Sequence, residues 1–322
     1  MMQYPRVLLT TYHHAFLKKG GGEFEIFSIS EKLKRHGLIA DIYGPHSRSL
    51  EHYDVVLHFS VHGGGLEMLQ HINSQGKPMV LWPNLWLTEA GNELTQLVNQ
   101  HVGLANSVVF KSRSEEQIFA NLFDLPAEKT RHSLTLADSA YLKPSPHQLF
   151  PDLYNLKDYA ICLGIIEPNK NQLATIKALK AAGITPVMVG GHRDEVYYQA
   201  CREAGGEGAV FLEALPSKSE ILRSALRDAL FYIETSFEPP GLSAIEAGLA
   251  GCRLVVSDSD WTREHFADLV LYCDPYDLES ISAAIAQIRL TTPGGNALQS
   301  HLKKHCADES ITQLVAILRG AT

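Results

Sequence analysis

The chain has 322 residues, of which 45% are hydrophobic and 20% are charged, and its formal net charge is −8. This length is long for one hydrophobic core and suits two domains of about 150 residues each. The acidic balance argues against an electrostatic grip on nucleic acid, because that grip requires clustered positive charge. An anionic small molecule stays open as a ligand, since a local pocket can be positive on an acidic protein.

We expect neither a targeting segment nor a membrane segment in this sequence. No apolar run reaches the roughly 18 to 20 residues that a membrane span requires, and the first residues lack the apolar stretch of a signal peptide. The five cysteines are odd in number and have no CxxC spacing. They argue against a disulfide framework or a zinc site and favour a reducing compartment, so we expect a cytoplasmic protein.

Short apolar runs alternate with helix-like segments along the first part of the chain. Runs typical of buried parallel strands lie at 7–10, 55–57, 79–81 and 107–110. Between the first two runs, apolar residues follow near-helical spacing, which predicts a helix over 24–36 that ends at Gly37.

A second series of apolar runs follows at 159–163, 186–189, 210–212, 229–233 and 253–256. Strands that alternate with helices predict right-handed βαβ units and open parallel sheets. Two prolines around Ser145 suit an extended connector. The sequence therefore predicts an α/β protein with two doubly wound, Rossmann-like domains facing across a cleft. The expected boundaries are 1–145, 146–300 and a helical tail over 301–322, whose return to the N-terminal domain is left open.

One stretch of the C-terminal half contains two glutamates, Glu238 and Glu246, separated by seven residues. The segment 239–241, Pro-Pro-Gly, breaks the chain, and a helix is expected to start near Leu242 or Ser243. The early amides of such a helix are unpaired and suit a phosphate. A carboxylate at Glu246 could bind two vicinal ribose hydroxyls, with Glu238 facing the group attached to the phosphate. A capped helix with a solvated Glu246 is the plain structural alternative.

The surrounding sequence resembles a known family. The run EPPGLSAIEAGLAGCRLVVSD is similar to the Glu-x7-Glu motif of retaining GT-B glycosyltransferases of family 4, a group that includes glycogen-synthase-like and lipopolysaccharide sugar transferases. The likeness continues over 259–285. In the N-terminal half it rests on the glycine loop at 20–23 and the strand at 105–112, and in the C-terminal half also on Gly190-Gly191.

The resemblance implies a role for each matching residue. Glu238 would contact hydroxyls of the transferred sugar, Glu246 would bind the nucleotide ribose, and Lys170 would neutralise the leaving diphosphate. The other donor-binding positions that it implies are backbone groups near the diphosphate and the base: Gly21, Gly22, Gly241, Leu242, Ser243 and Leu215.

One position departs from the family pattern. The family's Arg-x4-Lys element has Ile165 here in place of arginine. A charged hydrogen bond of that kind contributes about 1.5–3 kcal/mol. Arg193, on a neighbouring loop, is the candidate replacement. The loss leaves open a rerouted cation, an unusual donor or a weakened enzyme.

Several other patterns have a plain alternative beside a functional one. Asp258-Ser259-Asp260 imitates a metal motif, but Asp and Ser are also good turn and helix-cap residues. The triple glycine at 20–22 lacks the GxGxxG spacing of a dinucleotide site. Three residues near strand ends of the first half are acceptor-side candidates, with polar loop residues and core packing as the alternatives: His58, His62 and Trp82.

The resemblance implies sugar transfer with retention of anomeric configuration and with no required metal or cofactor. The donor would be a nucleotide sugar, UDP- or GDP-linked, and the acceptor a glycan or a lipid-linked glycan of a bacterial surface polysaccharide. Nucleic acid is not an expected partner, and peripheral contact with a membrane, at its inner face, is left open. Two other functions stay open: a nucleotide-sugar epimerase of the same fold and an inactive relative that binds a sugar nucleotide.

Overall fold

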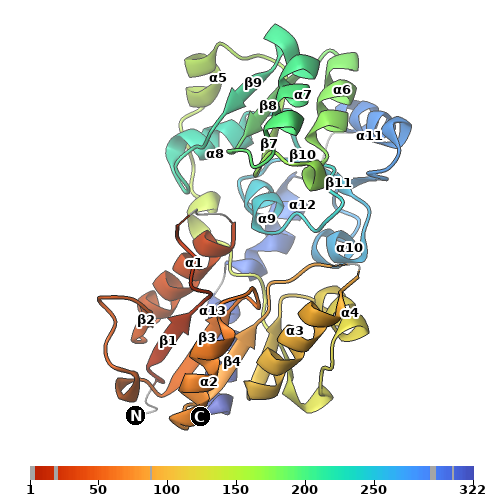
Figure 1. Ribbon diagram of the computed structural model, residues 1–322. Coiled ribbons are helices and arrows are strands. Elements are labelled where there is room, and N and C mark those ends of the chain that lie inside the picture. Colours follow the sequence, from red (N-terminus) through yellow and green to blue (C-terminus); the bar gives the residue numbers. More distant parts are fainter. Residues whose placement is uncertain (1–3, 18–20, 88, 291–294, 307) are drawn as a thin grey trace. The chain divides into compact units, whose positions relative to one another are not determined.

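The computed structural model describes residues 4–17, 21–87, 89–290, 295–306 and 308–322. These residues form two compact units. The first contains the described residues up to Leu136 and those from Asp308 onward, and the second runs from Ala137 to Cys306. Each unit is a six-stranded parallel sheet flanked by helices, as expected for two Rossmann-like domains (Figure 1). The predicted α/β fold class is confirmed.

The sheet of the first unit has the order β2-β1-β3-β4-β5-β6. Its strands are β1 (Val7–Thr10), β2 (Ala40–Ile42), β3 (Val55–Phe59), β4 (Met79–Trp82), β5 (Ser107–Phe110) and β6 (Thr130–His132). Its helices are α1 (Gly21–Arg35), α2 (Leu66–Ser74), α3 (Asn92–Leu104), α4 (Arg113–Leu122) and α13 (Asp308–Ala321), with short 3-10 turns η1 (Leu50–His52) and η2 (Ala127–Lys129). All residues of β1, β3, β4 and β5 are buried, because helices cover both faces of a parallel sheet.

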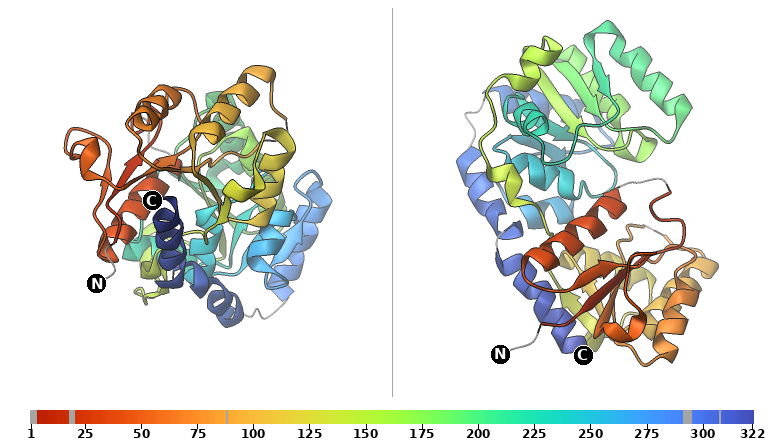
Figure 2. Two further views of the ribbon diagram at one scale, coloured as in Figure 1. Left: turned by 90° about the horizontal axis from the view of Figure 1, so that it is seen from below. Right: turned by 90° about the vertical axis from the view of Figure 1, so that its left-hand side faces the viewer.

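The last helix of the chain, α13, belongs to the first unit (Figure 2). Ile311, Leu314, Val315 and Leu318 recur at helical spacing and share one buried cluster with Val7 and other strand residues of that unit. The apolar face of α13 thereby closes the core over β3 and β4.

The sheet of the second unit has the order β12-β11-β10-β7-β8-β9. Its strands are β7 (Tyr159–Leu163), β8 (Thr185–Val189), β9 (Val210–Leu212), β10 (Phe231–Glu234), β11 (Leu254–Ser257) and β12 (Leu271–Cys273). Its helices are α5 (Leu149–Tyr154), α6 (Gln172–Ala181), α7 (Glu195–Gly205), α8 (Glu220–Arg227), α9 (Leu242–Leu249), α10 (Asp260–Phe266), α11 (Leu278–Leu290) and α12 (Gly295–Leu302), with 3-10 turns η3 (Ser139–Leu142), η4 (Pro168–Lys170), η5 (Gly206–Gly208) and η6 (Lys303–His305).

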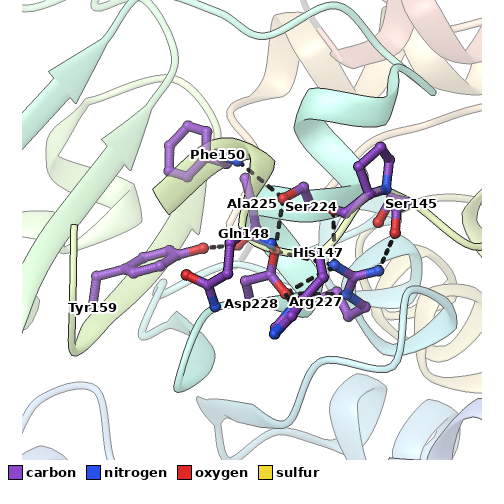
Figure 3. A network of polar contacts seen from close by, with 10 residues as sticks. Ser145, His147, Gln148, Phe150, Tyr159, Ser224, Ala225, Arg227 and Asp228 are labelled. Atoms are coloured by element: carbon purple, nitrogen blue, oxygen red, sulfur yellow. Dashed lines mark hydrogen bonds and ion pairs between the residues drawn. The ribbon is translucent and has the colours of Figure 1, made fainter. Parts of the chain in front are cut away.

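The proline-rich segment after η3 is attached to α8 of the second unit (Figure 3). Arg223 donates to the carbonyl oxygens of Ala140, Lys143 and Pro144 at 3.0 to 3.3 Å. Arg227 donates to those of Ser145 and Pro146. The compact units divide after Leu136, and these bonds attach residues 140–146 to α8 of the second unit.

Asp228, at the end of α8, fixes the next part of the same segment (Figure 3). Its carboxylate, whose side chain is 1% exposed, lies 2.8 Å from Nδ1 of His147 and accepts from the Gln148 amide at 3.0 Å. The Ser224 hydroxyl donates to the same carboxylate and accepts from the Phe150 amide. These polar bonds hold the start of α5 against α8.

Candidate active site

The second sheet has one topological switch point, between β7 and β10, where the chain changes the direction in which it adds strands. In open parallel sheets, ligands bind beyond the carboxyl ends of the strands at such a point. The segment after β7 contains Ile165 and Lys170, and the segment after β10 contains Glu238. The topology therefore places the predicted lysine and the first predicted glutamate beside each other.

Lys170 and Glu238 are in direct contact. The Lys170 ammonium lies 3.1 Å from Oε1 of Glu238 and 3.2 Å from Oε1 of Glu234. Burial on its own would lower the pKa of Lys170, but the Glu234 and Glu238 carboxylates raise it above its ordinary value. Lys170 is therefore a fixed positive charge at neutral pH, and it faces two acids.

The loop that holds Glu238 is fixed by short polar bonds. The Ser236 hydroxyl donates to the Glu238 carbonyl at 2.6 Å, and the Ser257 hydroxyl donates to the Ser236 carbonyl at 2.6 Å. The Phe237 amide donates to the Asn169 carbonyl at 2.9 Å. This last bond joins the Glu238 loop to the turn that contains Lys170, so the contact between the two side chains rests on a fixed backbone.

Helix α9 begins directly after this loop, as the Pro-Pro-Gly break predicts. Gly241 precedes it with φ +71°, a backbone conformation that side-chain-bearing residues rarely adopt. Leu242 and Ser243 form the first turn, whose amides have no partner inside the helix. The Ser243 hydroxyl lies 3.2 Å from Oε2 of Glu234 and 3.0 Å from the Pro240 carbonyl.

Glu246 lies one turn further along α9 and is half-buried. The Tyr141 hydroxyl donates to its carboxylate and also lies 3.5 Å from the Ser217 hydroxyl. Burial, followed by the Glu246 carboxylate, raises the pKa of Tyr141, which keeps this hydroxyl protonated as a donor. Leu215, the residue expected near the base, is on the same loop as Ser217. The second predicted glutamate thus lies close to the predicted base-binding loop.

The departure at Ile165 is accompanied by a close approach of two loops. Both Gly164 and Gly190 have positive φ, and a Cβ on Gly190 would lie 1.9 Å from the Gly164 carbonyl oxygen. Arg193, on the loop after β8, has a half-exposed side chain that lies 3.5 Å from Oε2 of Glu167. Arg193, the candidate replacement cation, therefore contacts the loop that contains Ile165 and Lys170.

In the first unit, Gly21 and Gly22 open helix α1, and Gly20 lies outside the described residues. A Cβ on Gly22 would lie 3.4 Å from the Asn84 side chain, an ordinary contact. Among the acceptor-side candidates, His58 is 1% exposed and Trp82 is fully buried, whereas His62 is exposed. Since His58 and Trp82 are enclosed within their own unit, we keep the acceptor-side expectation for His62 alone.

His58 is part of a buried pair of histidines. Its ring centroid lies 5.9 Å from that of His101, and its Nδ1 lies 2.9 Å from the Thr10 hydroxyl. Gly65 makes room for it, because a Cβ there would lie 2.8 Å from Nε2 of His58. Burial, followed by the proximity of His101, lowers the pKa of His58 to about 3.

We expect this histidine to make the stability of the first unit depend on pH. In the unfolded chain a histidine titrates near pH 6.5, whereas folding keeps His58 neutral down to about pH 3. The contribution of His58 to the free energy of unfolding is therefore complete above pH 6.5 and is lost as the pH falls towards 3. At pH 5 the loss is about 2 kcal/mol. Urea unfolding at pH 7.5 and pH 5 measures it. His58→Gln should show a smaller difference between the two pH values, with His46→Gln, at an exposed position of the same unit, as the control. An unchanged difference in His58→Gln contradicts the prediction.

Asp258-Ser259-Asp260 forms a helix cap, as the plain alternative holds. Ser259 is the N-cap of α10 and forms a capping box with Thr262. The Asp258 carboxylate accepts two bonds of 2.6 Å from Arg263. Over the described ranges of the chain, no group of three or more His, Cys, Asp or Glu side chains is arranged to hold a metal ion.

A membrane-spanning helix is absent from the part of the chain that the structure describes, where no helix combines sufficient length with sufficient apolar character.

The second unit is similar to proteins of a known family. Residues 151–300 match the family model described as glycosyl transferases group 1. The matched range includes Lys170, Glu238 and Glu246. Over 190 residues the chain is also 30% identical to O-antigen chain mannosyltransferase B of Escherichia coli, which covers 55% of this chain and 49% of that protein. The chain thus spans about half the length of this curated relative.

Solved structures match the whole described fold. A sucrose-phosphate synthase from Thermosynechococcus elongatus has a TM-score of 0.79 at 14% identity and covers 98% of this chain and 100% of its own. Anabaena HepE in complex with UDP and glucose has a TM-score of 0.77 at 17% identity, with 99% and 100% covered. A glycosyltransferase from Rickettsia africae has a TM-score of 0.76 at 13% identity, with 98% of each chain covered. The fold is GT-B, and with the domain match it supports a GT-B glycosyltransferase.

Proposed function

We propose that this protein is a retaining, metal-independent glycosyltransferase of family 4 that moves a sugar from a nucleoside diphosphate sugar to a glycan or lipid-linked acceptor. The observation that supports this most is the contact of Lys170 with Glu238 at the switch point, directly before the first turn of α9. That arrangement offers a cation and unpaired amides for a diphosphate, beside a carboxylate for sugar hydroxyls.

In the proposed reaction the acceptor hydroxyl attacks the anomeric carbon while the bond from that carbon to the diphosphate oxygen breaks. The departing phosphate takes the acceptor's proton, so the reaction needs no nucleophile from the protein. Lys170 and the amides of Gly241, Leu242 and Ser243 stabilise the negative charge that grows on the leaving group. Glu238 orients the transferred sugar through its hydroxyls. Exclusion of water from the closed site limits hydrolysis of the donor.

The nucleotide end is assigned to the other half of the site. Glu246 binds the ribose hydroxyls, with the Tyr141 hydroxyl fixing its carboxylate. Leu215 and its loop meet the base. Arg193 assists at the phosphates in place of the arginine that Ile165 replaces. From the first unit, the backbone of Gly21 and Gly22 approaches the diphosphate, and His62 is on the acceptor side. The donor is a substrate, and no separate cofactor is required.

The relatives guide the choice of sugar and acceptor. The Escherichia coli relative is named a mannosyltransferase of the O-antigen chain, and the Anabaena structure contains UDP and glucose. We propose a bacterial surface polysaccharide as the pathway, a UDP- or GDP-linked hexose as the donor, and action at the cytoplasmic face of the membrane.

Thermal-shift measurements with UDP-, GDP-, ADP- and CMP-sugars test the donor proposal. A ligand at 100 times its dissociation constant stabilises the folded state by about 2.7 kcal/mol, which raises Tm by about 5–10 °C in a domain of this size. We expect one base to give such a shift, and Glu246→Ala to reduce it to about half or less. If none of the four classes raises Tm above that of the protein without ligand, the result contradicts a nucleotide-sugar site.

The observation at Ile165 favours one second candidate, a relative that binds a sugar nucleotide without transferring the sugar. A shift in Tm without product across a panel of oligosaccharide and lipid-linked acceptors would favour it. Incubation with donor alone separates transfer from epimerisation, because an epimerase converts the donor without an acceptor.

A further inference from the structure

A third acid, Glu234, lies behind the proposed donor pocket. It is the last residue of β10 and its side chain is 1% exposed. Its Oε1 accepts from the Lys170 ammonium at 3.2 Å, and its Oε2 accepts from the Tyr232 hydroxyl. The Ser243 hydroxyl lies 3.2 Å from the same Oε2 and shares its one proton between Glu234 and the Pro240 carbonyl, which is at 3.0 Å. A buried carboxylate costs free energy unless its oxygens are hydrogen-bonded, and both oxygens of Glu234 are.

The donors to Glu234 come from separate parts of the site. Lys170 is at the end of η4 after β7, and Ser243 is in the first turn of α9. Tyr232 is within β10 and fully buried. One carboxylate therefore joins the proposed phosphate-binding lysine to the proposed phosphate-binding helix turn.

Glu234 and Glu238 differ in how accessible they are to a ligand. Their side chains are 1% and 35% exposed, respectively, although both contact the Lys170 ammonium. An ammonium has three N–H donors, so the two acids leave one for a phosphate oxygen. Glu238 is the acid that an arriving donor can displace or recruit, whereas Glu234 stays with the lysine.

We propose that Glu234 is the positioning residue of the donor pocket, which holds the Lys170 ammonium and the Ser243 hydroxyl where the leaving diphosphate meets them. This inference rests on the proposed function. With isoleucine at position 165, Lys170 lacks the neighbouring arginine of the family pattern. Turnover then depends more strongly on the place of the Lys170 ammonium, which Glu234 fixes.

Glu234→Gln tests the inference, because it keeps the size of the side chain and removes its charge. The variant should lower kcat by about 10- to 100-fold, as displacement of a reacting or stabilising group by about 1 Å does. The Kd of UDP or GDP, whichever the wild type binds, should stay equal or become tighter, since one negative charge leaves the pocket. Parallel losses in kcat, nucleotide affinity and Tm would instead mark a purely structural residue and overturn the inference.

A second readout needs no ligand. Trace labelling of lysines with acetic anhydride follows the free amine, and a pKa lower by one makes that amine about ten times more abundant. We expect Lys170 to label about tenfold faster in Glu234→Gln than in the wild type. Lys111, whose ammonium lies 3.2 Å from Glu25 in the first unit, is the internal reference and should not change. Wild-type labelling of Lys170, or faster labelling at both lysines, would overturn the inference.

Two tyrosine variants supply the matched control. Tyr232 and Tyr159 are both buried on strands of the second sheet, and each hydroxyl donates to one carboxylate or carbonyl acceptor: Glu234 for Tyr232, and the Ala225 carbonyl for Tyr159. Tyr232→Phe should lower kcat as Glu234→Gln does, because it removes a hydroxyl that fixes the Glu234 carboxylate, but it keeps the charge of Glu234, so Lys170 labelling should not exceed the wild-type rate. Tyr159→Phe should change neither kcat nor labelling. If wild-type protein binds no nucleotide, the proposed function fails, while the labelling still decides whether Glu234 holds Lys170.

Discussion

Replacing Lys170 by alanine is expected to lower kcat on the order of a hundredfold, comparable to the loss of one preorganised donor to a developing negative charge. Lys170 is the cation that contacts Glu238 at the switch point, and the two acids beside it keep it protonated. In the proposed reaction, its removal takes away the charge that meets the leaving diphosphate. Steady-state kinetics with the donor identified by thermal shift measure the effect.

The same substitution also removes the cation from a buried acid. Removing one partner of a buried ion pair costs about 3–5 kcal/mol, and Glu234 would be left with hydroxyl donors only. Stability must therefore be followed beside kcat. Lys170→Arg keeps the charge and should retain most of the stability, and Lys177→Ala, at an exposed position of α6, should match the wild type in both.

Wild-type turnover in Lys170→Ala would contradict the assignment and move the phosphate contact elsewhere. Arg193 is then the next side chain to replace, because it lies beside the loop that contains Ile165. A loss of kcat in Arg193→Ala together with full activity in Lys170→Ala would make Arg193 the principal cation.

The central strands could be predicted from sequence because each is a continuous apolar run. Three strands were missed: β2, β6 and β12, each of three residues at a sheet edge. An edge strand is covered on fewer sides, so its residues are not all apolar. In β6, for example, two of the three residues are exposed. Their pairing depends on the neighbouring strand and not on a pattern of their own.

The part of the candidate site that a local sequence motif specifies could be predicted from the sequence. The Pro-Pro-Gly break places α9 correctly, and the spacing of Glu238 and Glu246 then follows from the helix. Glu234 was missed, although an acid at the end of an otherwise apolar strand is a signal that sequence alone contains. Tyr141 had no such signal, since its contact with Glu246 joins residues 105 positions apart in the chain.

Two of the acceptor-side candidates, His58 and Trp82, are buried because their strands extend further than the sequence pattern predicts. Strand β3 continues through His58 to Phe59, and β4 includes Trp82. Both side chains therefore lie inside the layers of the first unit instead of on the loops after the strands. A shift of one or two residues in a strand end is enough to change a candidate ligand into a core residue.

Glu246→Ala and Glu238→Ala are expected to separate donor binding from turnover. Glu246 is assigned to the ribose, a part of the donor that does not change during transfer, so its loss weakens ground and transition states alike and raises Kd. Glu238 is assigned to hydroxyls of the transferred sugar, whose bond to the diphosphate breaks, so its loss should mainly lower kcat. Charged hydrogen bonds contribute about 1.5–3 kcal/mol each, which corresponds to about 10- to 100-fold in Kd or kcat.

Nucleotides without ribose hydroxyls make the test of Glu246 specific. Calorimetric titration of wild-type protein should show a 2′,3′-dideoxynucleoside diphosphate binding about 10- to 100-fold more weakly than the ribonucleotide. Glu246→Ala should bind both with the same weak affinity, because the carboxylate that distinguishes them is gone. Tyr141→Phe should fall between, since it leaves the carboxylate and removes the hydroxyl that holds it. If Glu246→Ala still prefers the ribonucleotide as strongly as the wild type does, the ribose is bound by another residue and the assignment of Glu246 is wrong.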